Sequence, residues 1–293
     1  MYVEKFGPNN IDAMMGGFKC LERMKENEEI LDVFQEIGPL FNSFPPLQIE
    51  KSKIFLNNSD YENTLDYINS KVNIKHFEIY KILAVCNLIH EGDYITASTN
   101  IDKMWDLLIT QEPKNPDLYF ITAQLFSRIC ERRLNIIKRC EIMIDKALEF
   151  SPKNAKYLIE KAQYRLHNGD IDRAFKIFTQ AAEIDANNKD STIGTVYCKI
   201  LMKKYKEAIE DIEFLRDIFN SLQLPLNPKI SYYEAVIRYK MGESEDIVSN
   251  VISEALNCHV KLAKQNNFTK YEFLIATEYD FLFDLSKGKL KNI

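Results

Sequence analysis

The stretch from Ala155 to Asn188, AKYLIEKAQYRLHNGDIDRAFKIFTQAAEIDANN, decides the fold. A Gly169-Asp170 turn lies near its middle, between two segments whose apolar residues recur at intervals of three and four. That spacing gives each segment a helical stripe to bury. Small residues stand where two antiparallel helices would approach closely, at Ala162, Ala174 and Ala181. The stretch is therefore predicted to form a helix-turn-helix hairpin.

Hairpins with this pattern are typical of tetratricopeptide repeats. Such a repeat takes about 34 residues, with a short turn in its middle and small residues at fixed positions on both helices. Counted from Ala155, the glycine turn and the alanines fall on those positions, and Phe178 belongs to the apolar stripe of the second helix. Ala162, Ala174, Phe178 and Ala181 are thus predicted to define the packing of this repeat.

The same pattern recurs along the chain. Units in this frame start near residues 10, 45, 78, 115, 155, 189 and 229 and together cover residues 10–262. Ala97, Ala147 and Ala208 are the small packing residues of three further units. The unit from 115 is the irregular one, and its extra residues are expected between its helices, near Glu131 to Leu134. The sequence predicts an all-α fold, a tetratricopeptide-type α-solenoid of about seven repeats plus an additional C-terminal helix.

The two ends of the sequence point to further elements. Residues 1–9 read as the end of a preceding repeat. Residues 263–293 are expected to form an extra helix, rich in aromatic residues between Phe268 and Leu285, and a tail. This is more apolar surface than a polar terminal cap should carry. We therefore expect the chain to be an internal portion or a truncated product of a longer solenoid.

Composition and charge exclude several classes of protein. The sequence is 46% hydrophobic and 28% charged, which is ordinary for a folded globular protein. Its formal net charge of -5 gives no global field for holding nucleic acid. The six cysteines are scattered without a C-x-x-C pair, and no stretch is apolar for long enough to span a membrane. We expect a soluble or peripherally recruited protein with reduced thiols.

No residue pattern indicates catalysis. Cys86 and His90 are spaced like two zinc ligands on a helix, but the other histidines offer no second pair, so a buried thiol beside a half-exposed ring is the better interpretation. Neither a nucleophile with its base nor a Gly-rich phosphate loop is present. The sequence therefore predicts no enzyme, no cofactor and no metal.

One polar cluster is a candidate for binding a partner. Five positive charges gather around the turn within the irregular unit: Arg128, Arg132, Arg133, Lys138 and Arg139. A local basic patch would suit an acidic partner segment, anionic lipid head groups or tubulin tails. The alternative is a solvated turn and helix face, which is what most charge clusters are.

Several stretches resemble the tetratricopeptide repeat protein 21 family. The resemblance covers nearly the whole chain, with order and spacing kept, and the most specific part is the Ser127-Arg128-x-Cys130 run. It is carried by Ala13–Glu22 (AMMGGFKCLE), Glu91-Gly92-Asp93, Glu112–Cys130 (EPKNPDLYFITAQLFSRIC), Ala208–Ile218 with its Glu-Phe-Leu run, and Tyr279–Leu285.

The resemblance implies a non-enzymatic function. Members of this family are the large repeat subunit of the intraflagellar transport A complex, which supports retrograde transport in cilia and flagella and the entry of membrane proteins into them. Expected partners are the repeat and propeller subunits of that complex, with possible contact to a membrane surface or to ciliary cargo. Expected locations are the cilium or flagellum, its basal body and a cytoplasmic pool.

A rival interpretation is a generic peptide-binding adaptor of the chaperone co-factor type. Such repeats hold a partner's C-terminal carboxylate with Lys and Asn side chains on their first helices. In the clearest repeat the candidates facing inward are Lys156 and Glu160, whose opposite charges do not suit a carboxylate. A nucleic-acid-processing repeat protein would need a basic stripe along the array, and there is none.

Overall fold

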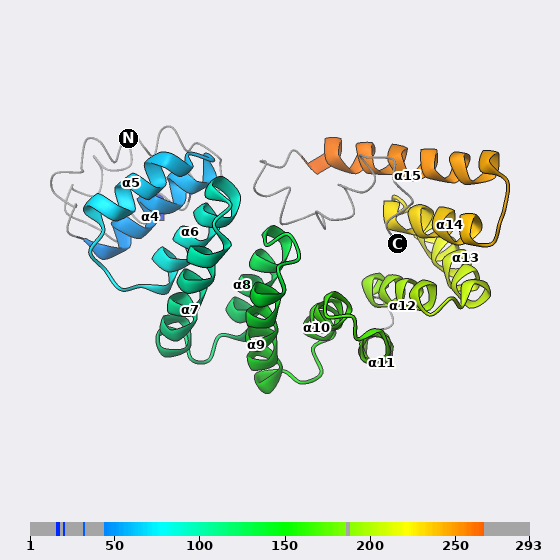
Figure 1. Cartoon of the computed structure of the whole chain (residues 1–293), viewed down its shortest axis with the longest axis horizontal. Coiled ribbons are helices and arrows are strands. Elements are labelled where there is room, and N and C mark those ends of the chain that lie inside the picture. The colour runs from blue at the N-terminus through cyan, green and yellow to red at the C-terminus, as the bar shows by residue number, and fades with distance from the viewer. Residues whose placement is uncertain (1–15, 18–19, 21–31, 33–43, 186–187, 267–293) are drawn as a thin grey trace. The chain divides into compact units, whose positions relative to one another are not determined.

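The computed structural model describes residues 16–17, 20, 32, 44–185 and 188–266 (Figure 1). Twelve α-helices and one π-helical turn lie in this part of the chain, and it contains no strand. The prediction of an all-α fold is therefore confirmed. The predicted end of a repeat at residues 1–9, nearly all of the unit from residue 10, and the aromatic helix from Phe268 to Leu285 lie outside the described residues.

The chain divides into two compact units, Met1–Pro113 and Lys114–Ile293. In the first unit, α4 packs with α5, α6 packs with α7, and α6 also contacts both α4 and α5. Its elements are α4 (Pro45–Asn57), α5 (Tyr61–Lys71), α6 (Phe77–Cys86), the π-helical turn η1 (Asn87–Glu91) and α7 (Tyr94–Gln111).

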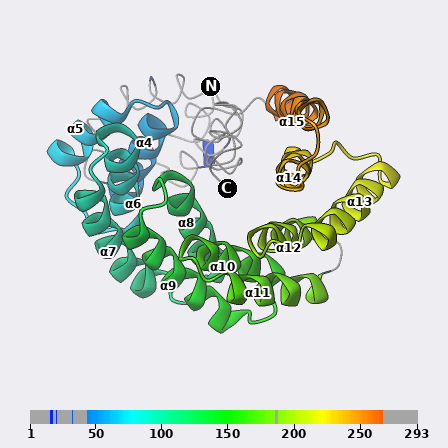
Figure 2. The ribbon, with the colours of Figure 1, turned by 45° about the vertical axis from the view of Figure 1, so that its right-hand side comes forward.

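The second unit contains four helix pairs. Within it each helix packs on the next, and the first helices of successive pairs also touch, α10 with α12 and α12 with α14 (Figure 2). The pairs are α8 (Pro116–Ile129) with α9 (Leu134–Phe150), α10 (Ala155–His167) with α11 (Ile171–Ile184), α12 (Lys189–Leu201) with α13 (Tyr205–Ser221), and α14 (Pro228–Lys240) with α15 (Glu245–Asn266).

Short polar side chains set where many of these helices begin. Asn154 accepts hydrogen bonds from the backbone N–H groups at the start of α10, and Asp170 does the same for α11. Each cap satisfies donors that lack a partner in the first helical turn. Between α10 and α11, Gly169 has a φ of 78°, a left-handed conformation that glycine adopts without steric cost. This is the turn that the sequence stretch 155–188 predicts.

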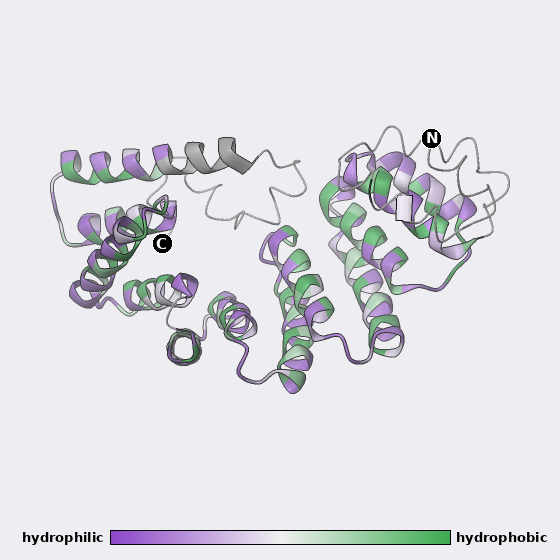
Figure 3. Cartoon of the chain, turned by 180° about the vertical axis from the view of Figure 1, so that it is seen from behind, coloured by the Kyte–Doolittle hydropathy of each residue, from purple (hydrophilic) through white to green (hydrophobic). Residues whose placement is uncertain are grey.

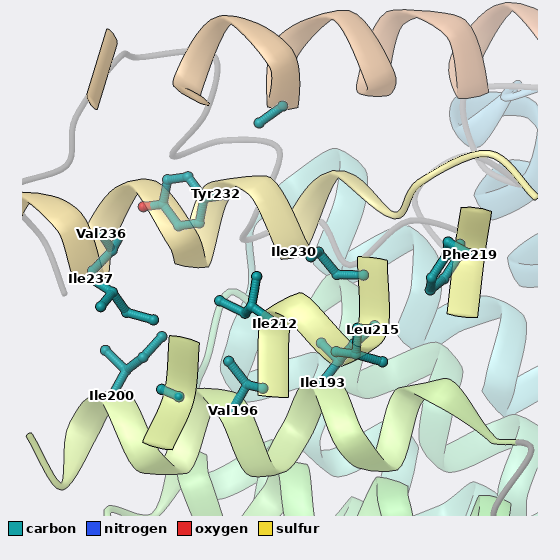
Figure 4. Packing of buried hydrophobic residues seen from close by; sticks show 12 residues of the cluster. Ile193, Val196, Ile200, Ile212, Leu215, Phe219, Ile230, Tyr232, Val236 and Ile237 are labelled. Atoms are coloured by element: carbon teal, nitrogen blue, oxygen red, sulfur yellow. The ribbon is translucent and has the colours of Figure 1, made fainter. Parts of the chain in front are cut away.

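Buried aliphatic and aromatic side chains join neighbouring pairs. One cluster binds α12, α13 and α14 together (Figure 4), and Figure 3 shows hydrophobic and hydrophilic residues alternating along the helices. Its larger members are Ile193, Val196, Ile200, Ile212, Leu215, Phe219, Ile230, Tyr232, Val236 and Ile237. Because side chains from three helices interlock, each pair depends on its neighbour for burial.

Two local features differ from the sequence-based expectations. The turn between α8 and α9 spans only residues 130–133, one residue more than the turn between α10 and α11, whereas α9 is three residues longer than α11, with 17 against 14. In the first unit α6 ends in the π-helical turn η1, which the pattern did not predict. There the buried Asn87 side-chain oxygen accepts a hydrogen bond from Asn100 Nδ2 at 2.8 Å, which ties η1 to α7.

Candidate interaction surface

The residues predicted to define the packing of the repeats all lie inside the structure. Each is at most 1% exposed, and they sit on second helices except for Ala162, which is on α10. The set is Ala97, Ala147, Ala162, Ala174, Phe178, Ala181 and Ala208. At the six alanines a methyl group lets two helices approach closely, and Phe178 fills space between helices. All seven therefore contribute to packing and are not available to a ligand.

Phe178 makes a contact that the sequence did not predict. Its ring, on α11, lies against Gly194 on α12, so closely that a Cβ atom at Gly194 would stand 2.3 Å from ring carbon Cε1. No side chain larger than hydrogen fits there without a shift. The contact between these two hairpins is therefore an aromatic ring packed against helix backbone at a glycine.

Arg128 occupies a position different from the one expected for a surface patch. Its side chain is 10% exposed and pairs with Glu160, which is 3% exposed, at 3.0 Å between Nη2 and Oε2. Gln124 Nε2 and Ser127 Oγ also donate to Glu160, and Arg128 donates to Gln163 as well. Arg128 therefore joins α8 to α10, and its assignment to an exposed basic cluster is wrong. Burial of Glu160 also removes it from the set of groups that could contact a peptide.

The other four basic residues lie at the start of α9. Arg132, Arg133 and Lys138 are exposed, whereas Arg139 is half-buried and donates from Nη1 to the backbone oxygen of Asn135 at 2.9 Å. Two large aliphatic side chains lie among them, Leu134 at 52% exposed and Ile142 at 54%. We call these six residues the α9 basic surface: Arg132, Arg133, Leu134, Lys138, Arg139 and Ile142.

The start of α9 is electrostatically unfavourable, more so than that of α13, which also begins at an uncapped basic residue, Lys204, but has Glu207 in its first turn. Arg133 is the N-cap residue and its side chain makes no capping hydrogen bond, and the first turn of α9 has no acidic residue. Positive charge at this end of a helix opposes the helix dipole. In the turn, Glu131 and Arg132 both have positive φ, 48° and 61°, a conformation that costs free energy in residues other than glycine. The local sequence is therefore not optimised for helix stability.

A second ionic network joins the last two helix pairs. Arg216 on α13 donates from Nε to Glu234 on α14 at 2.9 Å and from Nη2 to Glu254 on α15 at 2.6 Å. The hydrogen bond with Arg216 lowers the pKa of the Glu254 carboxyl and raises that of the Arg216 guanidinium. Sequence reasoning missed this network. A repeat-frame alignment could have found it, because Glu160 and Glu234 both fall sixth from the unit starts at 155 and 229.

The described residues hold no group of three or more His, Cys, Asp or Glu side chains arranged to bind a metal ion. Cys86 is buried and His90 is exposed, and burial raises the pKa of the Cys86 thiol to about 12. A thiol with that pKa stays protonated near neutral pH and is a poor nucleophile.

None of the helices in the described part of the chain is long and apolar enough to cross a membrane.

Comparison with known proteins assigns the chain to a family. The sequence profile of the tetratricopeptide repeat protein 21 second ARM domain matches residues 99–292, about two thirds of the sequence. The chain belongs to the tetratricopeptide repeat protein 21 family. The resemblance inferred from the residues alone is thereby confirmed.

Relatives within the tetratricopeptide repeat protein 21 family are distant in sequence. Human tetratricopeptide repeat protein 21B is 24% identical over 256 residues, covering 86% of this chain and 19% of the relative. The mouse 21B protein is 25% identical over 253 residues, with the same coverage. Mouse 21A is 23% identical over 232 residues, 78% of this chain and 17% of the relative. The chain thus spans about a fifth of the length of these proteins.

Solved structures support the fold. A tetratricopeptide repeat protein from Parabacteroides merdae aligns with a TM-score of 0.59 at 14% identity, covering 90% of this chain and 97% of that one. A chain in the APC/C hetero-tetramer Cut9–Hcn1 aligns with a TM-score of 0.52 at 12% identity, covering 94% and 50%. The chain therefore has the tetratricopeptide-type α-solenoid fold. Fold and family together indicate a non-enzymatic repeat scaffold of the tetratricopeptide repeat protein 21 type.

Proposed function

We propose that this chain forms part of a subunit of the intraflagellar transport A complex and acts there as a scaffold for protein–protein contacts. The observation that carries the proposal is the family match over residues 99–292. Its role would be to support retrograde transport and the entry of membrane proteins into cilia and flagella. The partners would be the repeat and propeller subunits of the complex, with peripheral contact to membrane or ciliary cargo. The protein would be found in the cilium, at the basal body and in a cytoplasmic pool.

The arrangement of the second unit supports a geometric mechanism. Stacked hairpins present many helix faces side by side, and weak contacts along them add up because they are linked in one chain. The two ionic joints and the Phe178 joint fix neighbouring pairs to one another. A surface held in place in this way pays little ordering entropy on binding. No catalytic group is needed for such a role.

Affinity purification of the tagged protein from ciliated cells tests the proposal. Subunits of the intraflagellar transport A complex should co-purify. Recovery of chaperones alone would instead support the alternative of a peptide-binding adaptor of the chaperone co-factor type. A matched sample carrying Arg132→Glu and Arg133→Glu should lose one partner while the far-UV circular dichroism of the purified chain is unchanged. Retention of every partner would show that the α9 basic surface is an ordinary solvated helix face that binds none of them.

A further inference from the structure

The α9 basic surface combines charge with apolar area in one line along the helix. Leu134, Lys138 and Ile142 are spaced i, i+4 and i+8, so they follow one another along one side of α9 over about 12 Å. Both aliphatic side chains are more than half exposed, and Lys138 lies between them. Arg132 and Arg133 extend the positive charge beyond the first turn. The surface therefore alternates apolar and basic groups.

Local stability does not account for this arrangement. The second helices α7 and α11 begin at capping aspartates, Asp93 and Asp170, which suit the helix dipole. α9 begins instead at an arginine with no capping bond, after two residues of positive φ. The start of α13 is similar, with Lys204 uncapped after Lys203 of positive φ, but its first turn contains the acidic Glu207, which α9 lacks. The exposed side of α11 carries charges of both signs, Asp172, Lys176 and Glu183 among them. The basic and apolar side of α9 is thus a local departure.

We propose that the α9 basic surface docks an acidic amphipathic helical segment of a partner protein. The segment would carry carboxylates opposite Lys138 and Arg133 and two apolar side chains about 12 Å apart, to cover Leu134 and Ile142. A membrane surface is a poorer fit, because a helix that lies in a bilayer separates its apolar side from its basic side. Here the two kinds of group share one line. The inference rests on the proposed scaffold role and names the class of partner.

A peptide probe tests this on the full 293-residue chain. The probe is a fluorescein-labelled helical peptide with Leu, Glu and Leu at i, i+4 and i+8 and further Glu residues at i+1 and i+5. Binding is measured by fluorescence anisotropy at low and high salt. Arg133→Gln with Lys138→Gln should raise the Kd about tenfold or more at low salt, and less at high salt, because exposed charges are screened. Ile142→Gln should raise it about fivefold at both salt concentrations.

Matched controls separate this site from general attraction of an anionic peptide. Lys176→Gln with Lys206→Gln removes two exposed positive charges from α11 and α13, and Ile247→Gln replaces a comparably exposed aliphatic side chain on α15. These controls should change the Kd less than twofold. Equal weakening by test and control variants would overturn the proposal. So would binding of phosphatidylserine vesicles that the Arg133 and Lys138 changes abolish while peptide binding is retained.

Two further outcomes are decisive. Concentration-dependent self-association in light scattering, lost in the Arg133 and Lys138 variant, would identify a second copy of this chain as the occupant and overturn a hetero-partner. Affinity purification of the tagged protein from ciliated cells, with and without Ile142→Gln, distinguishes this inference from the proposed function. Loss of one subunit of the complex supports it, and equal recovery of every subunit with both versions refutes it. Failure to recover any such subunit with the unmodified protein refutes the proposed function instead.

Discussion

Substituting alanine at Gly194 should destabilise the chain even though it removes a glycine from a helix interior. In an unconstrained helix this change stabilises by about 1 kcal/mol, because alanine loses less backbone entropy. Here the new Cβ would stand 2.3, 2.4 and 2.6 Å from three carbons of the Phe178 ring. Ordinary carbon contacts are about 3.5–4.0 Å, so the ring or the helix must move by about 1 Å.

The magnitude follows from how little room the ring has. Phe178 is 1% exposed and packs within the cluster that joins α10 and α11 to α12, so it has no empty space to enter. Overpacking of this kind costs about 1–3 kcal/mol. After the gain in helix propensity is subtracted, we expect Gly194→Ala to lower the free energy of unfolding by up to about 2 kcal/mol.

Two assays together measure this effect. Urea unfolding followed by circular dichroism gives the change in free energy, and hydrogen exchange read by mass spectrometry locates it. Faster exchange should be concentrated in α11 and α12, because in a repeat array each joint contributes its own interface energy. Gln180→Ala, an exposed change on α11, is the control and should be neutral or slightly stabilising.

A double-mutant cycle provides the refutation. In a Phe178→Leu background the ring edge is absent, so Gly194→Ala should then be neutral or stabilising, which gives a coupling energy of about 1–3 kcal/mol. If Gly194→Ala by itself stabilises the chain by about 1 kcal/mol, or if the two changes are additive, the ring does not constrain this position and the reasoning fails.

Three other predictions concern charged groups. Arg128→Ala should lower the free energy of unfolding by about 3–5 kcal/mol in urea titrations because it leaves a buried carboxylate unpaired, whereas Lys138→Ala should change it by less than about 0.5 kcal/mol. The His76 ring accepts a hydrogen bond from the first turn of α6, and burial lowers its pKa below 6.5. On acidification His76 therefore takes up a proton more readily in the unfolded chain than in the folded one, so stability should fall as the pH drops below 6.5. The variant His76→Asn keeps a capping residue, and its thermal unfolding should show less of this loss. The hydrogen bond with Arg216 lowers the pKa of Glu254, so its contribution is complete above the ordinary carboxyl pKa and is lost as the pH falls through the lowered value; Glu254→Gln should flatten the acid end of the stability profile.

The repeat geometry could be predicted from sequence because it rests on a narrow steric requirement. Only small side chains let two antiparallel helices approach closely at these positions. The buried positions of Ala162, Ala174 and Ala181 could therefore be predicted without any tertiary information. The π-helical turn after α6 was not predictable in this way, because its buried amide pair, Asn87 with Asn100, joins residues whose types fit many positions.

The candidate site was only partly predictable. Nearness along the chain grouped Arg128 with Arg132 and Arg133, but Arg128 lies on the last turn of α8, on the side that meets α10. Its partner, Glu160, is 32 residues further on. A charge count around a turn cannot separate a side chain that points to the next repeat from one that points to solvent. Burial, which depends on the stacking of hairpins, makes that distinction.

The joints between hairpins explain how successive hairpins of the second unit are held together although their sequence repeats only weakly. Counted from the unit starts at 155, 189 and 229, the sixth residue is Glu160, Gly194 and Glu234. Glu160 and Glu234 receive the preceding pair through an arginine, Arg128 and Arg216, whereas Gly194 receives it through the ring of Phe178.

The ionic joints and the aromatic joint are chemically exclusive. An arginine facing Gly194 would be buried without a partner, and a ring facing Glu160 would leave a carboxylate unpaired, so each mismatched joint would cost several kcal/mol. Charge and shape at the joints therefore distinguish the aromatic joint from the two ionic ones. The remaining helix faces are then free to vary, and in a scaffold those faces are the ones available to partners.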